Sequence, residues 1–167
     1  PYYDIIRQYA PLVDLDAAWA YGIIRQESRF TINAKSNVGA QGLMQVMPAT
    51  GKWMAGKMGL KGYHGGMLSN MYTNVHIGTH YLKYIQNDLL GSEVLATAAY
   101  NAGPSRARKW QAAVPLEGAI YAESIPFSET RDYVKQVMTN TYYYSRVLGQ
   151  PKPSLKKHLG VIPARAQ

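Results

Sequence analysis

The sequence predicts a mainly α-helical domain, and three observations support this fold class. Apolar side chains recur at the 3.6-residue spacing of amphipathic helices in several segments. Aspartate, serine, proline and glycine residues stand where such helices begin and end. The alternation of apolar and polar residues that marks half-buried strands is almost absent. With 167 residues and 47% hydrophobic content, the chain is long enough to bury the core of a single globular domain.

The N-terminal part of the chain contains three segments with helical signals. Asp14 or Asp16 can cap the second helix by accepting a hydrogen bond from an otherwise unpaired backbone N–H group. Pro48 suits the first turn of the third helix, where its missing N–H group costs nothing. Four glycines make Gly59–Leu68 a flexible surface loop, and a hairpin-like extended piece is expected at Val38–Val46. The predicted helices span Tyr2–Ala10, Ala17–Ser28 and Ala49–Met58.

The C-terminal part contains four more segments with helical signals. A long amphipathic helix runs from Asn74 and ends before Gly91, and Asn101–Pro104 interrupts the helical pattern that follows it. Residues 1–149 are expected to form one catalytic domain, and residues 150–167 read as an extended tail because they are rich in proline and lysine. The remaining predicted helices span Glu93–Tyr100, Ser105–Ala113 and Ser128 or Thr130 to Tyr144.

The composition narrows the classes of partner and of chemistry. Eighteen Lys and Arg against ten Asp and Glu give a net charge of +8, which favours acidic partners such as nucleic acid, anionic lipid or an acidic polymer. The absence of cysteine excludes disulfides, thiol chemistry and thiolate metal sites. No secretory signal and no long apolar run is present. Because the chain starts at Pro1, we expect a fragment or processed product whose export signal lies upstream.

Glu27 is a candidate general acid near the end of the second predicted helix. A helix advances about 100° per residue, so Ala20 and Ile23 lie about 20° and 40° from Glu27 on the same face. A carboxyl group among apolar neighbours is harder to ionise, which is the condition that a general acid needs near neutral pH. The alternative is an ordinary surface glutamate that caps the helix or pairs with Arg25 or Arg29.

Four blocks of sequence carry a resemblance to a known family. They read RQESRF, SNVGAQGLMQVMP, AAYNAGPSR and ESIPFSETRDYV, and they follow one another between Ile5 and Leu148. In this order and spacing the chain resembles the catalytic domain of the soluble lytic transglycosylases, bacterial enzymes that cleave the glycan strand of peptidoglycan. The resemblance implies a lysozyme-like fold of the goose-type kind, with the hairpin-like segment beside an open groove.

The resemblance also implies a mechanism with one carboxyl group. Glu27 would protonate the oxygen between N-acetylmuramic acid and N-acetylglucosamine, while the acetamido carbonyl of the muramic acid stabilises C1. Glu27 would then remove the proton of the C6 hydroxyl, which attacks C1 and forms a 1,6-anhydro ring. The two-carboxylate pattern of most glycosidases has substrate-assisted exceptions. No acidic residue lies between Ser28 and Gly66, which suits this route.

The resemblance assigns substrate contacts to the segment that follows Glu27. Ser36 matches a family serine that touches the acetamido group, although a turn-forming serine is the alternative. Gly39 and Gly42 allow left-handed backbone or a close approach of the sugar, and a plain tight turn would explain them equally well. Gln45 offers a donor and an acceptor to sugar groups. Met47 can lie under a sugar ring, or else belong to the core.

Further contacts are implied in the last two blocks. Tyr100 can direct its hydroxyl toward Glu27 or the muramic acid, unless it is a core residue. Asn101 matches the family as a binding residue and is also a good helix stop. Glu123 matches a family acid on the groove wall, and its alternative is a loop acid paired with Arg131.

No cofactor and no metal is expected. His76 and His80 stand one helical turn apart, but neither a third ligand nor an HExxH motif accompanies them. A basic nucleic-acid binder would show steep salt dependence, but no nucleic-acid motif supports that alternative. A hydrolytic muramidase on the same fold, and a silent peptidoglycan-binding module, stay open as rivals.

The expected partner is the glycan strand of peptidoglycan. The resemblance places the protein in the periplasm, with outer-membrane association through an upstream segment as a further option. We expect a monomer, joined to an upstream helical domain that this chain does not include.

Overall fold

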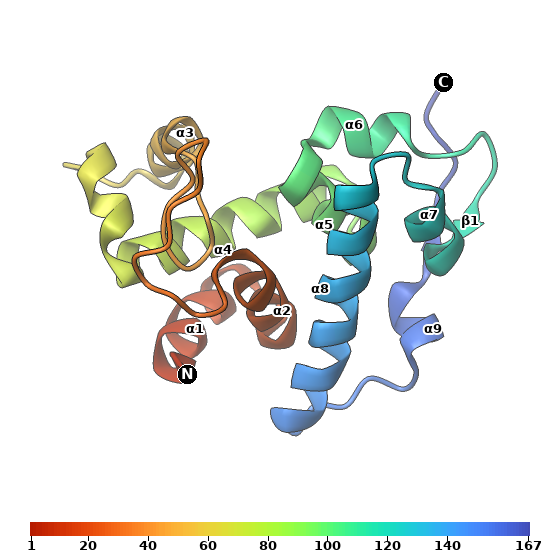
Figure 1. Ribbon diagram of the computed structural model, residues 1–167, viewed down its shortest axis with the longest axis horizontal. Helices are drawn as coiled ribbons and strands as arrows, with labels where there is room; N and C mark the ends of the chain where they lie inside the picture. The colour runs from red at the N-terminus through yellow and green to blue at the C-terminus, as the bar shows by residue number, and fades with distance from the viewer. The chain divides into compact units, whose positions relative to one another are not determined.

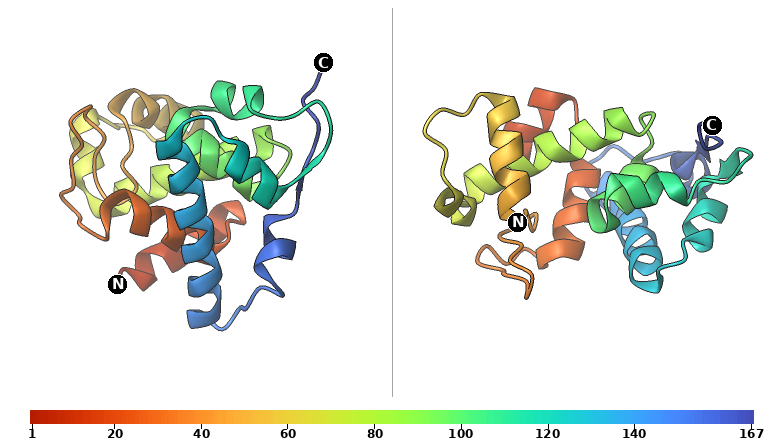
Figure 2. Two further views of the ribbon diagram at one scale, coloured as in Figure 1. Left: turned by 45° about the vertical axis from the view of Figure 1, so that its right-hand side comes forward. Right: turned by 90° about the horizontal axis from the view of Figure 1, so that it is seen from above.

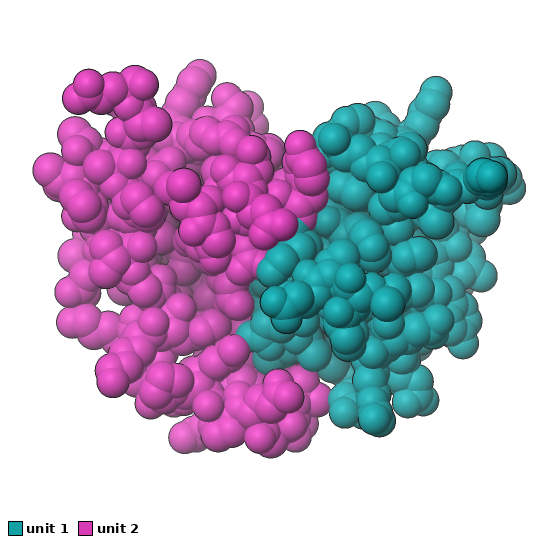
Figure 3. All heavy atoms as spheres, turned by 180° about the vertical axis from the view of Figure 1, so that it is seen from behind, with its two compact units in different colours: residues 1–83 teal, residues 84–167 magenta.

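The computed structural model describes the whole chain, residues 1–167, as a set of helices with one small sheet (Figure 1). The chain forms two compact units, Pro1–Lys83 (unit 1) and Tyr84–Gln167 (unit 2), which Figure 3 shows in different colours. The sequence predicts a single domain, so this division is a finding of the structure. The expected catalytic domain at residues 1–149 stays a prediction.

Unit 1 is helical, and its elements follow the local signals of the sequence closely. Asp16 caps the second helix, since its Oδ1 accepts a hydrogen bond of 2.9 Å from the N–H of Ala18. Pro48 occupies the first turn of the third helix, as expected. The elements are α1 (Tyr3–Tyr9), η1 (Ala10–Val13), α2 (Ala17–Ser28), α3 (Pro48–Met58), η2 (Gly65–Ser69) and α4 (Met71–Asp88), whose last turn belongs to unit 2.

Most of the fully buried side chains of unit 1 come from α1, α2 and α4, and α1 packs against α2. Leu43 and Met44 in the loop before α3, and Leu68 in η2, are fully buried as well. Two predictions need correction here. The predicted loop Gly59–Leu68 ends in the short helix η2, and α4 begins at Met71, ahead of the predicted start at Asn74.

Unit 2 contains the remaining helices and the sheet. Helix α5 packs against α6 and α8, while α7 and α9 contact each other and lie beside α8 (Figures 1 and 2). Helix α8 buries the predicted apolar face, which includes Tyr133, Val134 and Val137. The elements are α5 (Glu93–Ala102), α6 (Pro104–Lys109), β1 (Leu116–Glu117), α7 (Gly118–Ser124), α8 (Ser128–Val147), α9 (Leu155–Leu159) and β2 (Val161–Ile162).

The predicted ends of two helices in unit 2 were wrong, and one helix was not predicted. Asn101 does not stop α5, which continues through Ala102 and ends at Gly103, where φ is +95°. Helix α6 ends at Lys109 and does not reach Ala113. Helix α7 was not predicted at all. It has only seven residues, a length at which a helix depends on tertiary packing more than on its own sequence.

Residues 150–167 do not form the expected extended tail. They contain α9 and β2, and β2 pairs antiparallel with β1 so that Leu116 faces Ile162. In addition, the N–H of Gly118 donates to the carbonyl of Gly160 at 2.8 Å. Composition alone missed this order, because the partners of the segment's backbone groups lie about 40 residues earlier in the chain.

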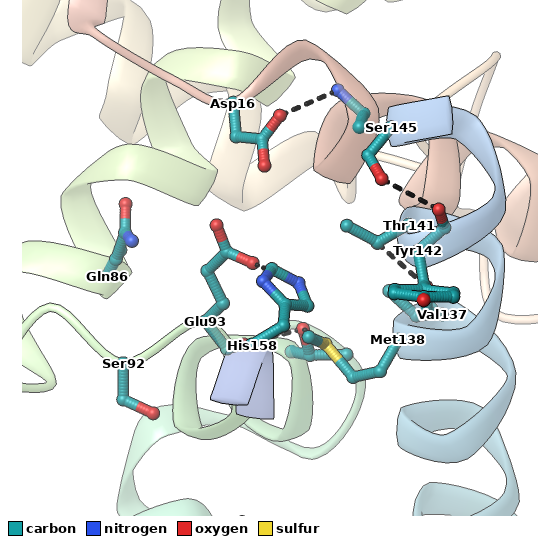
Figure 4. Close-up of polar contacts among 12 residues, drawn as sticks. Asp16, Gln86, Ser92, Glu93, Val137, Met138, Thr141, Tyr142, Ser145 and His158 are labelled. Atoms are coloured by element: carbon teal, nitrogen blue, oxygen red, sulfur yellow. Dashed lines mark hydrogen bonds and ion pairs between the residues drawn. The ribbon is translucent and has the colours of Figure 1, made fainter. Parts of the chain in front are cut away.

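Side chains also hold this C-terminal segment. His158 Nε2 lies 3.1 Å from Glu93 Oε2, and the two side chains are only 7% and 17% exposed (Figure 4). The Nε2 of Gln111 donates to the carbonyl of Pro163 at 3.0 Å. The start of α5 and the segment after α6 therefore both contact the end of the chain.

The segment Val38–Val46 contains antiparallel pairing, but no regular strand. Gln41 makes two isolated bridges, one to Lys35 and one to Val46. The regular strands of this protein are β1 and β2. No helix in the structure has both the length and the apolar character that crossing a membrane requires.

Candidate active site

Glu27 lies in the last turn of α2, on the edge of its buried face. Ala20, Ile23 and Ile24 are fully buried, while Arg25 and Gln26 are exposed and Glu27 is half-buried between these extremes. Glu27 thus shares its helix face with buried apolar residues, as its position in the sequence predicted, but is itself only half-buried.

The chain reverses direction immediately after Glu27. Arg29 and Phe30 both have left-handed backbone, with φ of 49° and 64°. Two successive non-glycine residues in this region are uncommon and cost free energy that the surrounding contacts must offset. The ring of Phe30 supplies such contacts, because its centroid lies 6.4 Å from that of Tyr2 and 6.0 Å from that of Tyr21. No signal in the sequence predicted this turn.

Ser36 closes a tight turn in the loop between α2 and α3. Its Oγ accepts a hydrogen bond of 3.0 Å from the N–H of Ala40, and its carbonyl accepts one of 3.1 Å from the N–H of Gly39. The turn-forming alternative therefore describes what this serine does in the structure. Its hydroxyl hydrogen is not used in these contacts, so a role as a donor to substrate is still compatible with the turn.

Gln45 also has a structural role in the same loop. Its Nε2 donates to the carbonyls of Ala34 and Gly42, at 3.0 and 2.9 Å, which occupies both amide hydrogens. Of the donor and acceptor expected for sugar groups, only the Oε1 acceptor remains. Met47 stands just before α3 and is 38% exposed, so it is not a core residue.

A residue outside the predicted set anchors this loop. Asn74 in α4 is fully buried and hydrogen-bonds backbone groups of Gln41 and Met44. From the sequence, Asn74 was expected only as the start of a helix. The one signal for a larger role is an amide close to the apolar Val75 and Ile77, because a buried amide needs hydrogen-bond partners.

In unit 2, Tyr100 and Asn101 lie at the end of α5. Both are half-buried. The Oδ1 of Asn101 accepts a hydrogen bond of 2.7 Å from the hydroxyl of Thr130 at the start of α8. This contact leaves the two amide hydrogens of Asn101 for other partners.

Glu123 lies in the last turn of α7 and is exposed. Its Oε1 is 2.6 Å from Lys135 Nζ in α8, and this hydrogen-bonded cation, with a smaller contribution from Arg131, holds the pKa of Glu123 below its ordinary value. The expected alternative partner was Arg131, but Arg131 donates to the carbonyl of Ile125. Glu123 also lines a cavity of about 200 Å³ whose walls are mainly apolar residues of α7, α8 and α9.

Two histidines of unit 1, His76 and His80, form ring contacts. The ring of His76 stacks on Tyr9 at 4.5 Å and meets the ring of His80 edge-on at 4.9 Å. Burial, together with the charge of His80, lowers the pKa of His76 below its ordinary value. No group of three or more His, Cys, Asp or Glu side chains is placed to hold a metal ion.

Two family models match the chain. The transglycosylase SLT domain matches residues 4–120, and the soluble lytic transglycosylase helical domain matches residues 124–153. The chain is 41% identical over 152 residues to the soluble lytic murein transglycosylase of Salmonella typhimurium, covering 89% of this chain and 24% of that protein. It thus spans about a quarter of the length of the curated relatives that it matches.

Solved structures are similar over nearly the whole chain. Lytic transglycosylase Slt of Pseudomonas aeruginosa, solved as an inactive mutant with glutamine in place of a glutamate, matches with a TM-score of 0.91 and 36% identity, covering 98% of this chain and 27% of that one. The soluble lytic transglycosylase Slt70 of Escherichia coli matches with a TM-score of 0.85 and 38% identity, covering 93% and 25%. These matches confirm the predicted mainly α, lysozyme-like fold class.

Proposed function

The chain belongs to the transglycosylase SLT domain family, and on this premise we propose that it is the catalytic part of a lytic transglycosylase that acts on peptidoglycan. The observation that carries the proposal is the family match over residues 4–120, at about 40% identity to named murein transglycosylases. The bond cleaved is the β-1,4 bond between N-acetylmuramic acid and N-acetylglucosamine, and the product carries a 1,6-anhydro ring.

Glu27 is the proposed acid and base of this reaction. It donates its proton to the glycosidic oxygen as the C1–O bond breaks, and the acetamido oxygen of the muramic acid bonds to C1. The carboxylate then takes the proton of the C6 hydroxyl, whose oxygen displaces the acetamido oxygen at C1. Protons balance and no water is consumed. The half-buried place of Glu27 beside Ile23 and Ile24 supports the acid role.

The related structure with glutamine in place of a glutamate is described as inactive, so that relative depends on at least one glutamate. This chain has five glutamates. Glu27 shares its helix face with fully buried apolar residues and precedes a turn with left-handed backbone. Glu93 lies beside His158, and Glu123 is exposed and engaged by Lys135. We therefore assign catalysis to Glu27.

The strand-binding residues are proposed from the groups that their structural contacts leave available. In unit 1 these are the hydroxyl hydrogen of Ser36, the Oε1 of Gln45 and the exposed side chain of Met47. In unit 2 they are the amide hydrogens of Asn101, and Glu123, whose solvent-exposed ion pair with Lys135 contributes little stability. Tyr100 is proposed on the family resemblance and on its half-buried place at the end of α5.

Digestion of purified sacculi tests the proposal. The products are analysed by mass spectrometry for the parent, for Glu27→Gln and for Glu129→Gln, an exposed glutamate in the first turn of α8 that receives the same change. The parent and Glu129→Gln should release anhydro-muropeptides, lighter by one water than hydrolysis products. Glu27→Gln should lose a factor of about 10² to 10⁴ in kcat, the usual contribution of general acid–base catalysis.

Each alternative function has a distinct outcome in this assay. Reducing muramic acid ends would identify a hydrolytic muramidase on the same fold. Strand binding without turnover by the parent would identify a silent binding module. A Glu27→Gln variant as active as the parent would remove Glu27 from the mechanism.

The site of action follows from the proposed substrate. Peptidoglycan lies in the periplasm of Gram-negative bacteria, so we place the protein there, as a monomer that binds the glycan strand. The relatives are about four times longer than this chain, which supports the expectation of an upstream helical domain. Outer-membrane association through that upstream part belongs to the same proposal.

A further inference from the structure

The side chain of Asn74 uses its hydrogen-bonding groups to join three segments of unit 1. Its Oδ1 accepts from the N–H of Met44 at 2.9 Å. Its Nδ2 donates to the carbonyls of Gln41, at 2.8 Å, and Leu68, at 3.0 Å. Asn74 is fully buried, so these three partners replace water completely. A buried amide is tolerated only when it is satisfied in this way.

The contacts of Asn74 differ from those of its neighbours on α4. Asn70 accepts from the N–H groups of Tyr72 and Thr73, which is local capping at the start of the helix. Thr79 is fully buried as well, but its hydroxyl donates only to carbonyls of its own helix, those of Val75 and His76. Asn74 instead reaches a segment 30 residues earlier in the chain.

The two bonds to Gln41 and Met44 enclose the Gly42–Leu43 turn. Gly42 has a φ of +77°, and a Cβ atom added to it would lie 2.3 Å from Asn74 Nδ2 and 2.6 Å from Asn74 Cγ. Only a glycine at this position leaves room for the amide. The absence of a side chain at Gly42 and the buried amide of Asn74 thus require each other sterically.

The anchored segment leads directly into two proposed strand-binding residues. Leu43 and Met44 are fully buried, whereas Gln45 is half-buried and Met47 is 38% exposed. The bonds from Asn74 fix the backbone at Gln41 and Met44, and so restrict the positions open to the side chains that follow. Without Asn74, the loop would keep only its own bonds, such as the pair between Gln41 and Val46.

From this geometry we infer that Asn74 is a positioning residue of the glycan-binding site: it does not touch substrate, and it holds the 41–44 backbone so that Gln45 and Met47 meet the strand. The inference rests on the proposed function of Gln45 and Met47. It assigns Asn74 a role in substrate affinity, while Glu27 on α2 keeps its role in turnover.

Steady-state kinetics on soluble glycan strands test the inference with Asn74→Asp, Asn74→Leu and the matched control Thr79→Val. At neutral pH the aspartate carboxylate has no donor for the carbonyls of Gln41 and Leu68, and leucine has neither donor nor acceptor. Loss of two or three bonds predicts a KM about 10- to 100-fold higher in both variants, with kcat changed less than about threefold. Thr79→Val should keep the parental KM although it also loses a buried hydroxyl.

Lowering the pH tests whether the lost donor causes the higher KM. A protonated aspartic acid regains one O–H donor, so the KM of Asn74→Asp should fall toward that of the parent as the pH decreases, and that of Asn74→Leu should not. The groups in contact with Asn74 are backbone groups, which do not titrate in this range. An Asn74→Asp variant with parental KM at neutral pH would overturn the inference, and so would an equal KM increase in Thr79→Val.

Amide hydrogen exchange gives a readout that needs no turnover. In Asn74→Leu the N–H of Met44 loses its acceptor and should exchange at least about tenfold faster, while amides of α2 keep their protection; unchanged exchange at Met44 would refute the anchor. If Asn74→Leu fails to fold, Asn74→Asp, which keeps an acceptor for the N–H of Met44, decides the inference through its KM. If the parent shows no transglycosylase activity, the proposed function fails, and the Kd for an N-acetylglucosamine oligomer replaces KM in deciding the inference.

Discussion

Adding one methyl group at Gly42 should destabilise this protein far more than the same change at Gly39. Both glycines have left-handed backbone, with φ of +77° and +95°. A Cβ atom at Gly42 would lie 2.3 Å from Asn74 Nδ2, whereas a Cβ atom at Gly39 would meet no atom within 4 Å. The pair of variants therefore shares the backbone strain and differs in the contact with Asn74.

The expected magnitudes follow from these two contributions. Left-handed backbone costs alanine about 1–2 kcal/mol, and Gly39→Ala should lose that amount and little more. At Gly42 the methyl group must also displace an amide that makes three hydrogen bonds, each worth about 1 kcal/mol, or else force the backbone apart at about 1–3 kcal/mol. Gly42→Ala should thus lose about 3–5 kcal/mol, roughly 2–3 kcal/mol more than Gly39→Ala.

Urea unfolding followed by far-UV circular dichroism measures both free energies. The double variant Gly42→Ala with Asn74→Ala supplies the decisive comparison, because removal of the amide leaves space for the methyl group. In the Asn74→Ala background, Gly42→Ala should cost no more than Gly39→Ala costs in the parent. Equal losses for the two glycine variants, or strict additivity in the double variant, would refute the steric reasoning.

Three further predictions concern other parts of the molecule. Tyr121→Phe should lower the free energy of unfolding by about 1–3 kcal/mol, because the carbonyl of Ala107 loses its buried donor. Burial raises the pKa of the Tyr121 phenol, and a spectroscopic titration of the parent measures this increase. The folded pKa of His76 is below 6.5, so its contribution to stability is complete above pH 6.5 and is lost as the pH falls below that value; the urea midpoint of His76→Gln should therefore fall less on acidification than that of the parent. Ile162→Ala, at a position 2% exposed in β2, should cost about 2–5 kcal/mol in thermal or urea unfolding, whereas Val161→Ala, at 64% exposure, should cost little; similar losses at both positions would contradict the packing of the C-terminal segment.

The parts of the fold that the sequence predicted well depend on neighbouring residues. Helix α2 spans Ala17–Ser28 as expected, because its cap at Asp16 and its apolar face can both be read within one stretch of chain. The parts that were missed are short. Helices α7 and α9 and strand β2 are stabilised by partners distant in the sequence, and no local pattern identifies such partners.

The candidate site divides in the same way. The helix face that Glu27 shares with Ile23 could be predicted, since helix geometry alone relates the two positions, whereas the half-buried state of Glu27 could not. The hydrogen-bond partner of each polar side chain could not be predicted. Gln45 donates both of its amide hydrogens within its own loop, and Asn101 accepts from Thr130 and does not end α5.

The amino-acid sequence by itself determined a mainly helical fold, the family and a candidate carboxyl group, because helical periodicity, caps and short motifs can each be read within one stretch of chain. Tertiary structure alone decided which backbone groups Asn74 satisfies, why Gly42 must lack a side chain, and where residues 150–167 pack. Asn74 bonds Gln41 and Met44, and β2 pairs with β1, across 30 or more residues of sequence. A buried polar group bonds to the partner that lies next to it in space, and the separation of two residues in the sequence says little about whether they are close in space.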